Sequence, residues 1–296
     1  MSVFAPTPLI TPTAPPSRGA RKFRRVTALR HRSTVVNLIG LAGLTLLVLV
    51  ALLAPVLAPY SPILRAGAPF QPPLSPGFLF GTDALGYDIF SRLLFGLRAS
   101  ITAAAIVIAS GVIIGGLVGV VAGALGGWAD GTLMRITDLF LALPGILIAM
   151  VVAAALGASF TSSLIGVAVV WWPMYARLVR GEVRSWAARP HLEAATLAGV
   201  GWSRRVARHL LPGVTSTVVI AASLDVGGLV VAMSGLSFIG LSSPAPAPEL
   251  GAMAAQGMQY LLQYWWVPVV PGLAVMLLAL CANLAGDGIR DLLARR

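Results

Sequence analysis

Side chains able to act as nucleophiles, bases or metal ligands are few in this sequence, and they do not form a catalytic set. The three histidines, His31, His191 and His209, lie outside the long apolar runs, so a serine–histidine pair cannot be built within them. The single cysteine, Cys281, excludes an internal disulfide and a multi-cysteine metal site. The only lysine is Lys22, and the Gly-Lys-Ser/Thr phosphate-binding pattern is absent. We therefore expect no catalytic residue, metal site, bound cofactor or ATPase site, and an intramembrane hydrolase is a remote alternative.

Composition places the chain in a lipid bilayer. Of its 296 residues 57% are hydrophobic and 10% are charged, and the mean hydropathy is +0.88, too apolar for a water-soluble core. The formal charge of +11 could suggest nucleic acid, but that requires basic residues gathered on one folded face. Here they lie at the ends of apolar segments, so no nucleic-acid partner is expected.

Six apolar runs are long enough to cross a bilayer, which needs about 20 residues. They lie at 35–58, 99–122, 134–156, 160–180, 213–235 and 265–285. The first run exceeds the apolar core of a signal peptide, about 7 to 15 residues, so it is interpreted as a retained span. The run at 160–180 contains Pro173, which membrane helices tolerate. The predicted fold class is an all-α polytopic membrane protein with six transmembrane helices.

Basic residues orient these spans. Seven precede the first run, seven lie between Arg177 and Arg208, and three follow the last run. Because basic residues favour the cytoplasmic side, both termini and the 181–212 loop are expected there. The predicted organisation is a disordered basic tail (1–33), a first transmembrane helix (34–58), an external loop with an amphipathic helix (59–98), a core of five transmembrane helices (99–286) containing the cytoplasmic loop 181–212, and a cytoplasmic tail (287–296).

The stretch from Glu193 to Pro212 is the longest polar, basic interruption between two spans. Residues 193–198 are good helix formers, glycines interrupt at 199 and 201, and a second helix is predicted from Trp202 to Leu211, ended by Pro212. Val206 and Leu210 lie on one side of that second helix. Its other side carries Arg204, Arg205 and Arg208. Such an element suits either a groove on an acidic-rimmed soluble partner or lipid headgroups.

Charges within the spans are costly and each requires an interpretation. Asp225 is the one acidic residue deep in an apolar run, and either a translocation cavity or a partner on another helix accounts for it. Asp138 lies one turn from Arg135, which predicts an i, i+3 pair. Acidic residues at the cytoplasmic ends are expected to be solvated or to contact a soluble partner: Asp130, Asp287 and Asp291. The candidate translocation path comprises Asp225, Asp138 and Met233.

Two external segments are candidate contacts for an outside partner. Within residues 81–100 a short amphipathic helix is predicted, because Phe90, Leu93, Leu94 and Leu97 share one face. Asp88 and Arg92 form an i, i+4 pair on its other side. It suits an interfacial elbow on the bilayer or a partner contact equally well. The candidate contact residues are Asp83, Tyr87, Asp88 and Arg92. The last external loop is rich in Gly and Pro, contains one charge, Glu249, and is interpreted as a shaped turn.

The central stretch resembles the EAA loop of ABC importer permeases in Glu193, Ala194, Ala195, Gly199, Leu211 and Pro212. His209 departs from it, standing where an aliphatic residue is usual. Four further stretches are similar to the C-type permeases of dipeptide, oligopeptide and nickel importers: GTDALGYDIFSRLLFGLRAS (81–100), GGWADGTLMRITDLFLALP (126–144), GLSFIGL (235–241) and NLAGDGIRDLL (283–293). Tyr87 stands where that family frequently has Arg.

This resemblance implies a type I ABC importer permease fold in a bacterial inner membrane. It also implies a homologous B-type permease, two ATPase subunits holding ATP and Mg, and an extracytoplasmic substrate-binding protein as partners. ATPase coupling would fall on Glu193, Ala194, Ala195, Gly199, Arg204, Arg205, Leu211 and Pro212. Short peptides are the expected cargo, with nickel or its chelate as the alternative.

Overall fold

A computed structural model describes residues 36–190, 198, 200–242 and 246–293 of the chain. Residues 37–296 form one compact unit, separate from residues 1–36. Its described elements are all helical. They are the helix Val36–Leu52, α2 (Ala54–Leu57), α3 (Ile89–Leu125), α4 (Gly127–Ala142), α5 (Gly145–Leu156), α6 (Phe160–Ala187), α8 (Trp202–Arg205), a π-helical turn (Val206–Leu210), α9 (Leu211–Phe238), α10 (Leu250–Gly257), a 3₁₀ turn (Met258–Tyr260) and α11 (Trp266–Leu293).

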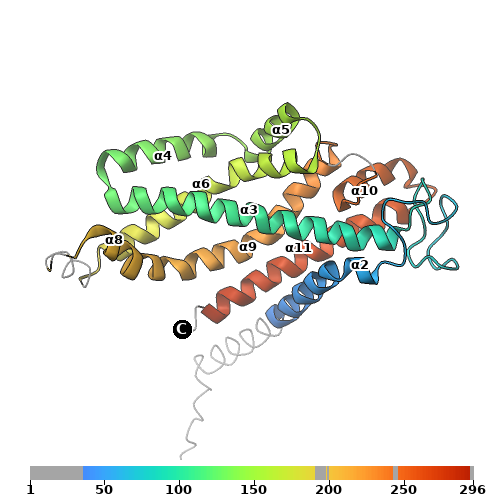
Figure 1. The fold of residues 1–296 in the computed structure, drawn as a ribbon, viewed down its shortest axis with the longest axis horizontal. Helices are drawn as coiled ribbons and strands as arrows, with labels where there is room; N and C mark the ends of the chain where they lie inside the picture. Colours follow the sequence, from blue (N-terminus) through green and yellow to red (C-terminus); the bar gives the residue numbers. More distant parts are fainter. Residues whose placement is uncertain (1–35, 191–197, 199, 243–245, 294–296) are drawn as a thin grey trace, which may run out of the picture. The chain divides into compact units, whose positions relative to one another are not determined.

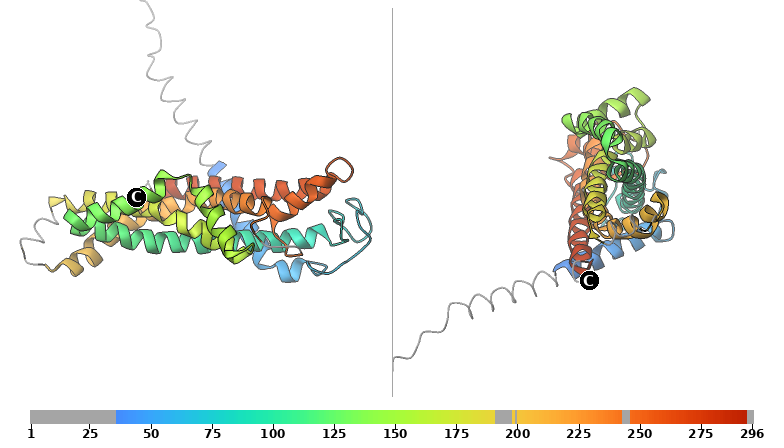
Figure 2. Two further views of the ribbon diagram at one scale, coloured as in Figure 1. Left: turned by 90° about the horizontal axis from the view of Figure 1, so that it is seen from above. Right: turned by 90° about the vertical axis from the view of Figure 1, so that its left-hand side faces the viewer.

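Four helices are long and apolar enough to cross a membrane: α3, α6, α9 and α11. They run along the same long direction through the unit in both sets of views (Figures 1 and 2). A fifth span results if α4 and α5 count as one broken helix, and Val36–Leu52 is a shorter apolar helix. The described helices therefore overlap all six expected runs, and four of them, or five if α4 and α5 form one span, are long and apolar enough to cross a membrane.

The third run is not one straight span. Helices α4 and α5 meet at an angle of 86°. Leu143 is extended (φ −103°, ψ 148°) and Pro144 precedes the first residue of α5. Proline has no N–H to donate and disfavours the helical conformation of the residue before it. The prediction of a single helix over 134–156 was therefore wrong at this point, because Leu143 and Pro144 end α4.

Helix α3 is longer than predicted, because the amphipathic segment and the second span form one continuous helix of 37 residues. The Asp88 side chain caps its start by accepting a hydrogen bond from the Ser91 backbone N–H, 2.8 Å away. At 1.5 Å per residue the helix is about 55 Å long, against a hydrocarbon core of about 30 Å.

Glycines on one face of α3 allow it to approach α6 closely. They recur every fourth residue, at Gly111, Gly115, Gly119 and Gly123. A Cβ atom added at Gly115 would lie 2.3 Å from the carbonyl oxygen of Trp172. Helices pack this tightly in membranes by using small residues at the contact. This glycine seam makes α3 and α6 the most closely associated pair of long helices in the unit.

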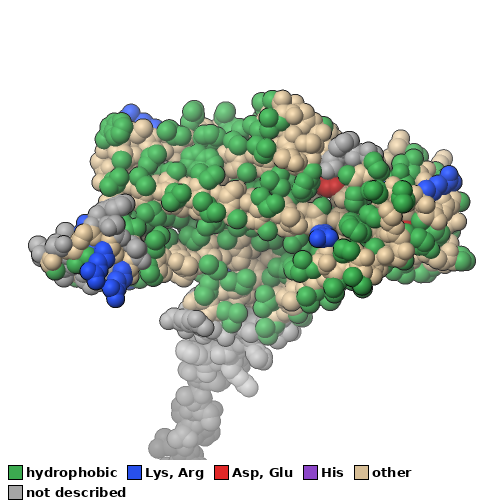
Figure 3. Space-filling view, viewed as in Figure 1, with side chains coloured by type: hydrophobic (Ala, Val, Ile, Leu, Met, Phe, Trp, Pro, Cys, Tyr) green, Lys and Arg blue, Asp and Glu red, His purple; other side chains and the backbone are tan. Residues whose placement is uncertain are grey.

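Large apolar side chains remain exposed along the helices, among them Ile113, Leu117, Val151 and Leu280. Figure 3 shows hydrophobic side chains over most of the visible face, with most of the visible Lys and Arg side chains near its two ends and one group of basic atoms between them. A surface of this kind suits contact with lipid rather than water. The end of the unit that carries residues 59–88 is called the loop end below, and the end that carries α8 the basic end (Figure 1).

Candidate functional site

At the basic end, a short helical element presents arginines outward and apolar side chains inward. Arg204 and Arg208 are exposed, whereas Val206 and Leu210 are buried. The two buried side chains pack in one cluster with Val179 and Val183 of α6 and Val214 of α9. The predicted division into a basic and an apolar side is therefore confirmed for these four residues, whereas Arg205, predicted on the basic side, is half-buried. These apolar contacts hold the exposed basic surface against α6 and α9.

The chain continues from this element into α9 without a break. Leu211 is the first residue of α9, and Pro212 stands in its first turn, where the missing N–H costs no helical hydrogen bond. The prediction that Pro212 ends a helix was wrong, because it lies where a helix begins. The other predicted coupling residues, Glu193, Ala194, Ala195 and Gly199, lie outside the described residues.

Asp130, near the start of α4, ties that helix to α6. Arg180 donates from Nε and Nη2 to the two carboxylate oxygens, and Arg184 Nη2 donates to Oδ2 at 2.6 Å. The Asp130 side chain is 10% exposed. The expectation that Asp130 is solvated or contacts a partner was wrong, because its carboxylate is occupied by two guanidinium groups from one helix.

Midway along α9, Asp225 lines a cavity of about 490 Å³ between α4, α6 and α9. Its carboxylate accepts a hydrogen bond from the indole N–H of Trp171, 3.1 Å away on α6. Asp225 therefore has the partner on another helix that one interpretation predicted, and it also lines a cavity. The remaining lining is largely apolar, from Leu141, Met174, Leu178 and Ala221, with Tyr175 and Arg177.

Asp138 lies on α4 and pairs with α6, not with its own helix. Its Oδ1 accepts from Nη2 of Arg177 at 2.6 Å, and both side chains are about half exposed. The predicted i, i+3 pair with Arg135 was wrong, because the α4–α6 contact brings Arg177 to this carboxylate. Met233, the third residue of the predicted path, is 2% exposed and packs in the main core.

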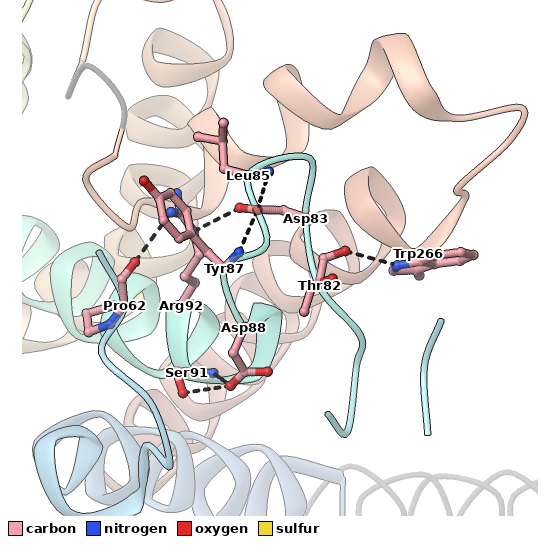
Figure 4. Close-up of polar contacts among 9 residues, drawn as sticks. All are labelled: Pro62, Thr82, Asp83, Leu85, Tyr87, Asp88, Ser91, Arg92 and Trp266. Atoms are coloured by element: carbon pink, nitrogen blue, oxygen red, sulfur yellow. Dashed lines mark hydrogen bonds and ion pairs between the residues drawn. The ribbon is translucent and has the colours of Figure 1, made fainter. Parts of the chain in front are cut away.

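At the loop end, the segment before α3 is a closely packed turn built on two side chains (Figure 4). Asp83 Oδ1 accepts hydrogen bonds from the backbone N–H groups of Leu85 and Tyr87, each at 2.9 Å. Thr82 is fully buried, and its hydroxyl donates to the carbonyl of Ala68 at 2.7 Å. The indole N–H of Trp266 donates to the Thr82 carbonyl at 3.4 Å, which joins this turn to α11.

Arg92 and Asp88 are part of this packing and are not paired with each other. The Arg92 side chain is 3% exposed, its Nε lies 3.7 Å from Asp83 Oδ2, and Nη1 donates to the carbonyl of Pro62 at 3.3 Å. The Tyr87 ring lies 4.9 Å from the guanidinium carbon, a cation–π distance. The predicted Asp88–Arg92 pair was wrong, because Asp88 caps α3 and Arg92 turns toward Asp83.

A second cavity, of about 230 Å³, opens beside this turn. It is lined by polar side chains from both halves of the chain, among them Asp83, Arg92, Gln256, Gln259 and Tyr260. The Nε of Arg92 is buried without a hydrogen-bond partner among the described residues. Of the predicted contact residues, Asp83 and Tyr87 are partly exposed at the loop end, while Asp88 and Arg92 are buried beneath them.

Glu249 is a buried carboxyl that the sequence did not mark as buried. It precedes α10 and is 3% exposed, close to the hydroxyls of Ser237 and Ser242. Burial raises the pKa of Glu249, and contacts with these hydroxyls and with the backbone N–H groups of Gly251 and Ala252 offset part of that increase. Its Oε2 has no hydrogen-bond partner in the described part of the chain.

Sequence reasoning missed Tyr175 and Arg177, which line the mid-unit cavity beside Asp225, and Trp171, which donates a hydrogen bond to Asp225. The available signal was the spacing of Trp171 and Tyr175, which lie four residues apart and hence on one face of α6. Within residues 36–190, 198, 200–242 and 246–293, no group of three His, Cys, Asp or Glu side chains is placed to hold a metal ion.

Two family models match the chain. One, described as "Binding-protein-dependent transport system inner membrane component", matches residues 111–296. The other, described as "N-terminal TM domain of oligopeptide transport permease C", matches residues 29–73.

Similar curated proteins are named as peptide transport permeases. The probable D,D-dipeptide transport system permease protein DdpC of Escherichia coli (strain K12) is 39% identical over 251 residues, 84% of each chain. The di/tripeptide transport system permease protein DppC of Pseudomonas aeruginosa is 37% identical over 260 residues, 86% of each chain. The glutathione transport system permease protein GsiD of Pectobacterium atrosepticum is 39% identical over 72% of this chain and 71% of its own.

Among solved structures, a chain of the inward-facing MetNI methionine ABC transporter matches with a TM-score of 0.55 and 20% identity, over 69% of this chain and 97% of its own. This likeness concerns the fold, which is that of an ABC importer permease. With the family model covering residues 111–296 and relatives at 39% identity, the chain belongs to the inner membrane components of binding-protein-dependent transport systems and is a multi-pass permease subunit.

Proposed function

We propose that this permease subunit forms half of a translocation pathway for di- or oligopeptides in a bacterial inner membrane. A homologous B-type permease forms the other half, and two partner ATPase subunits hold ATP and Mg. A substrate-binding protein delivers the peptide from outside. Peptides are proposed over nickel because the relatives described above are named for peptides.

The substrate is tested by measuring ATPase stimulation of the reconstituted complex by a binding protein loaded with a peptide pool or with nickel chelate. Stimulation by the chelate alone would refute peptide import.

The observation that carries the coupling proposal is the seated basic element at the basic end. Arg204 and Arg208 are exposed while Val206 and Leu210 are buried against two spans. A permease needs such an element, because work done by ATP binding on a soluble subunit must reach helices in lipid. The contact surface comprises Glu193, Ala194, Ala195, Gly199, Arg204, Arg205, Leu211 and Pro212.

The coupling proposal is tested by replacing Gly199 with proline in the reconstituted complex. The variant is expected to insert into the membrane and to bind loaded binding protein, but to lose peptide uptake, because proline fixes the backbone at the position where the sequence predicts a glycine bend. Wild-type uptake by Gly199→Pro would refute the coupling role.

The basic end is proposed to face the cytoplasm, together with both termini, and the loop end to face the binding protein. Asp83 and Tyr87 then belong to the docking rim around the 230 Å³ cavity, with Asp88 and Arg92 fixing its shape. In a Cys281→Ser background, a membrane-impermeant maleimide should label Leu74→Cys in intact spheroplasts and Arg208→Cys only after permeabilisation. The reverse pattern would refute this orientation.

A further inference from the structure

The mid-unit cavity combines an acidic group, a basic group and apolar walls within one chain. Asp225 of α9 and Arg177 of α6 both line it, and Leu141, Met174 and Leu178 supply apolar surface. Asp225 is the fifteenth of the 28 residues of α9, so the cavity lies near the middle of a helix long enough to span the bilayer. A charged group at that depth is costly unless it has a partner or a functional role.

The carboxylate of Asp225 is only partly satisfied. Among the described residues it has an indole N–H donor, Trp171, and no ion-pair partner. The hydroxyl of Tyr175, a side chain that is 1% exposed, lies close enough to interact with the same carboxylate. Asp225 is only partly buried, and it forms a polar end of the cavity at which a cationic donor would make a charge-assisted hydrogen bond.

The second charged group lining the cavity can receive an anion. Among the described residues, Arg177 donates a hydrogen bond from Nη2 to Oδ1 of Asp138. A guanidinium carries five N–H donors in a fixed fork, so it can hold Asp138 and a second carboxylate together. The cavity volume of about 490 Å³ leaves room for a small organic molecule between the two charges.

We propose that this cavity is a transit site for a short zwitterionic peptide, whose protonated α-amine pairs with Asp225 and whose α-carboxylate pairs with Arg177. An extended dipeptide separates these two groups by about 7 Å, the length of two residues. Its side chains would contact Leu141, Met174 and Leu178. The proposal rests on peptide import as the proposed function and adds the chemistry by which this chain recognises its cargo.

The test compares three probes on the complete transporter in lipid nanodiscs, without the binding protein, in the nucleotide-free and ATP-bound states. Radiolabelled dialanine carries both charges, N-acetyl-dialanine lacks the amine charge, and dialanine amide lacks the carboxylate charge. The wild type should bind dialanine about ten- to a hundredfold more tightly than either analogue, the range for hydrogen bonds to charged groups. Absence of dialanine binding in both states would overturn the proposal.

Two variants assign each charge to its residue. Asp225→Asn should abolish the preference for dialanine over N-acetyl-dialanine, yet keep its preference over dialanine amide. Arg177→Gln should abolish the preference for dialanine over dialanine amide, yet keep the preference over N-acetyl-dialanine. Because each result is a ratio within one variant, a general loss of stability does not imitate it. Asp287→Asn, which removes an exposed carboxylate of α11 outside the cavity, should leave both ratios unchanged.

Retained discrimination in Asp225→Asn and Arg177→Gln would overturn the site. So would equal binding of all probes by the wild type, the result expected if a cationic side chain of the partner permease occupies Asp225. Failure of the proposed function gives a different result, because the wild-type transporter with its binding protein would then not take up dialanine into vesicles at all. If uptake occurs and the variants retain their ratios, only the transit site is refuted.

Discussion

Replacing Gly115 with alanine should force α3 and α6 apart, whereas the same change at Gly116 should not. A Cβ atom at Gly115 would lie 2.3 Å from the carbonyl oxygen of Trp172 and 2.7 Å from Cβ of Tyr175. The third near atom is the backbone nitrogen of Ala176, at 2.9 Å. Because the Trp172 oxygen and the Ala176 nitrogen are backbone atoms of α6, a change of side-chain rotamer cannot relieve these contacts. At Gly116, one residue along the same helix, no such atom lies within 4 Å.

The expected difference in Tm between Gly115→Ala and Gly116→Ala follows from two opposing effects of the added methyl group. Alanine is about 0.8–1.0 kcal/mol better than glycine inside a helix, a gain common to both variants. Overpacking a close contact costs about 1–3 kcal/mol, and only Gly115→Ala incurs it. Because the propensity gain cancels in the comparison, the Tm of Gly115→Ala should lie about 2 to 12 °C below that of Gly116→Ala, at about 2–4 °C per kcal/mol.

The assay is thermal unfolding of the purified transporter in one detergent, followed by fluorescence-detected size exclusion. Gly119→Ala is a second test of the seam, because its Cβ would lie 2.6 Å from the carbonyl oxygen of Ala176. Equal Tm values for Gly115→Ala, Gly119→Ala and Gly116→Ala would refute close packing of these two helices.

Three further perturbations separate the remaining features. Asp130→Asn should lower the free energy of unfolding by about 2 kcal/mol, measured as Tm, because it removes the charge that holds two partly solvated arginines of α6; an unchanged Tm would contradict this role. Burial raises the pKa of Glu249, so its contribution to stability is complete below the ordinary carboxyl pKa and falls as pH rises through the raised value. Glu249→Gln should therefore flatten the fall of Tm that the wild type shows as pH rises above the ordinary carboxyl pKa, and parallel curves would argue against the burial effect. Val206→Asp should detach the basic element from its apolar contacts and reduce association with the ATPase subunits at all salt concentrations. Arg208→Gln should reduce this association mainly at low salt, because salt screens an exposed charge. The same salt dependence in both variants would contradict the assigned roles.

Apolar run length located the spans because a helix crossing lipid must be apolar over a fixed length whatever it packs against. The sequence shows a proline at position 144, but a proline within an apolar run can either end a helix or lie inside a continuous one. Pro173 and Pro271 lie inside unbroken helices, while Pro144 follows the end of one. Local sequence does not distinguish these outcomes, because neighbouring helices decide whether the freed backbone groups find partners.

Charge partners were the least predictable part of the candidate site. Asp138 has an arginine one turn away, at Arg135, yet pairs with Arg177, 39 residues later. Asp130 likewise pairs with Arg180 and Arg184. Neighbours along a helix can be read from spacing, but partners across helices depend on how α4 lies on α6. The identity of Asp225 as a site residue was predictable, since an acidic residue in mid-span is costly wherever its partner lies.

Because α3 is one unbroken helix, a small tilt at one of its ends produces a large displacement at the other end. Its 37 residues make a rod about 55 Å long, starting at the Asp83 turn and ending where α4 begins. If one end is held, a tilt of about 10° moves the other end by about 10 Å, from the rod length alone. The glycine seam joins α3 to α6, and α6 contacts the basic element. If the basic element transmits ATP binding as proposed, a small rotation there would therefore appear as a displacement of several ångströms at the rim of the loop-end cavity.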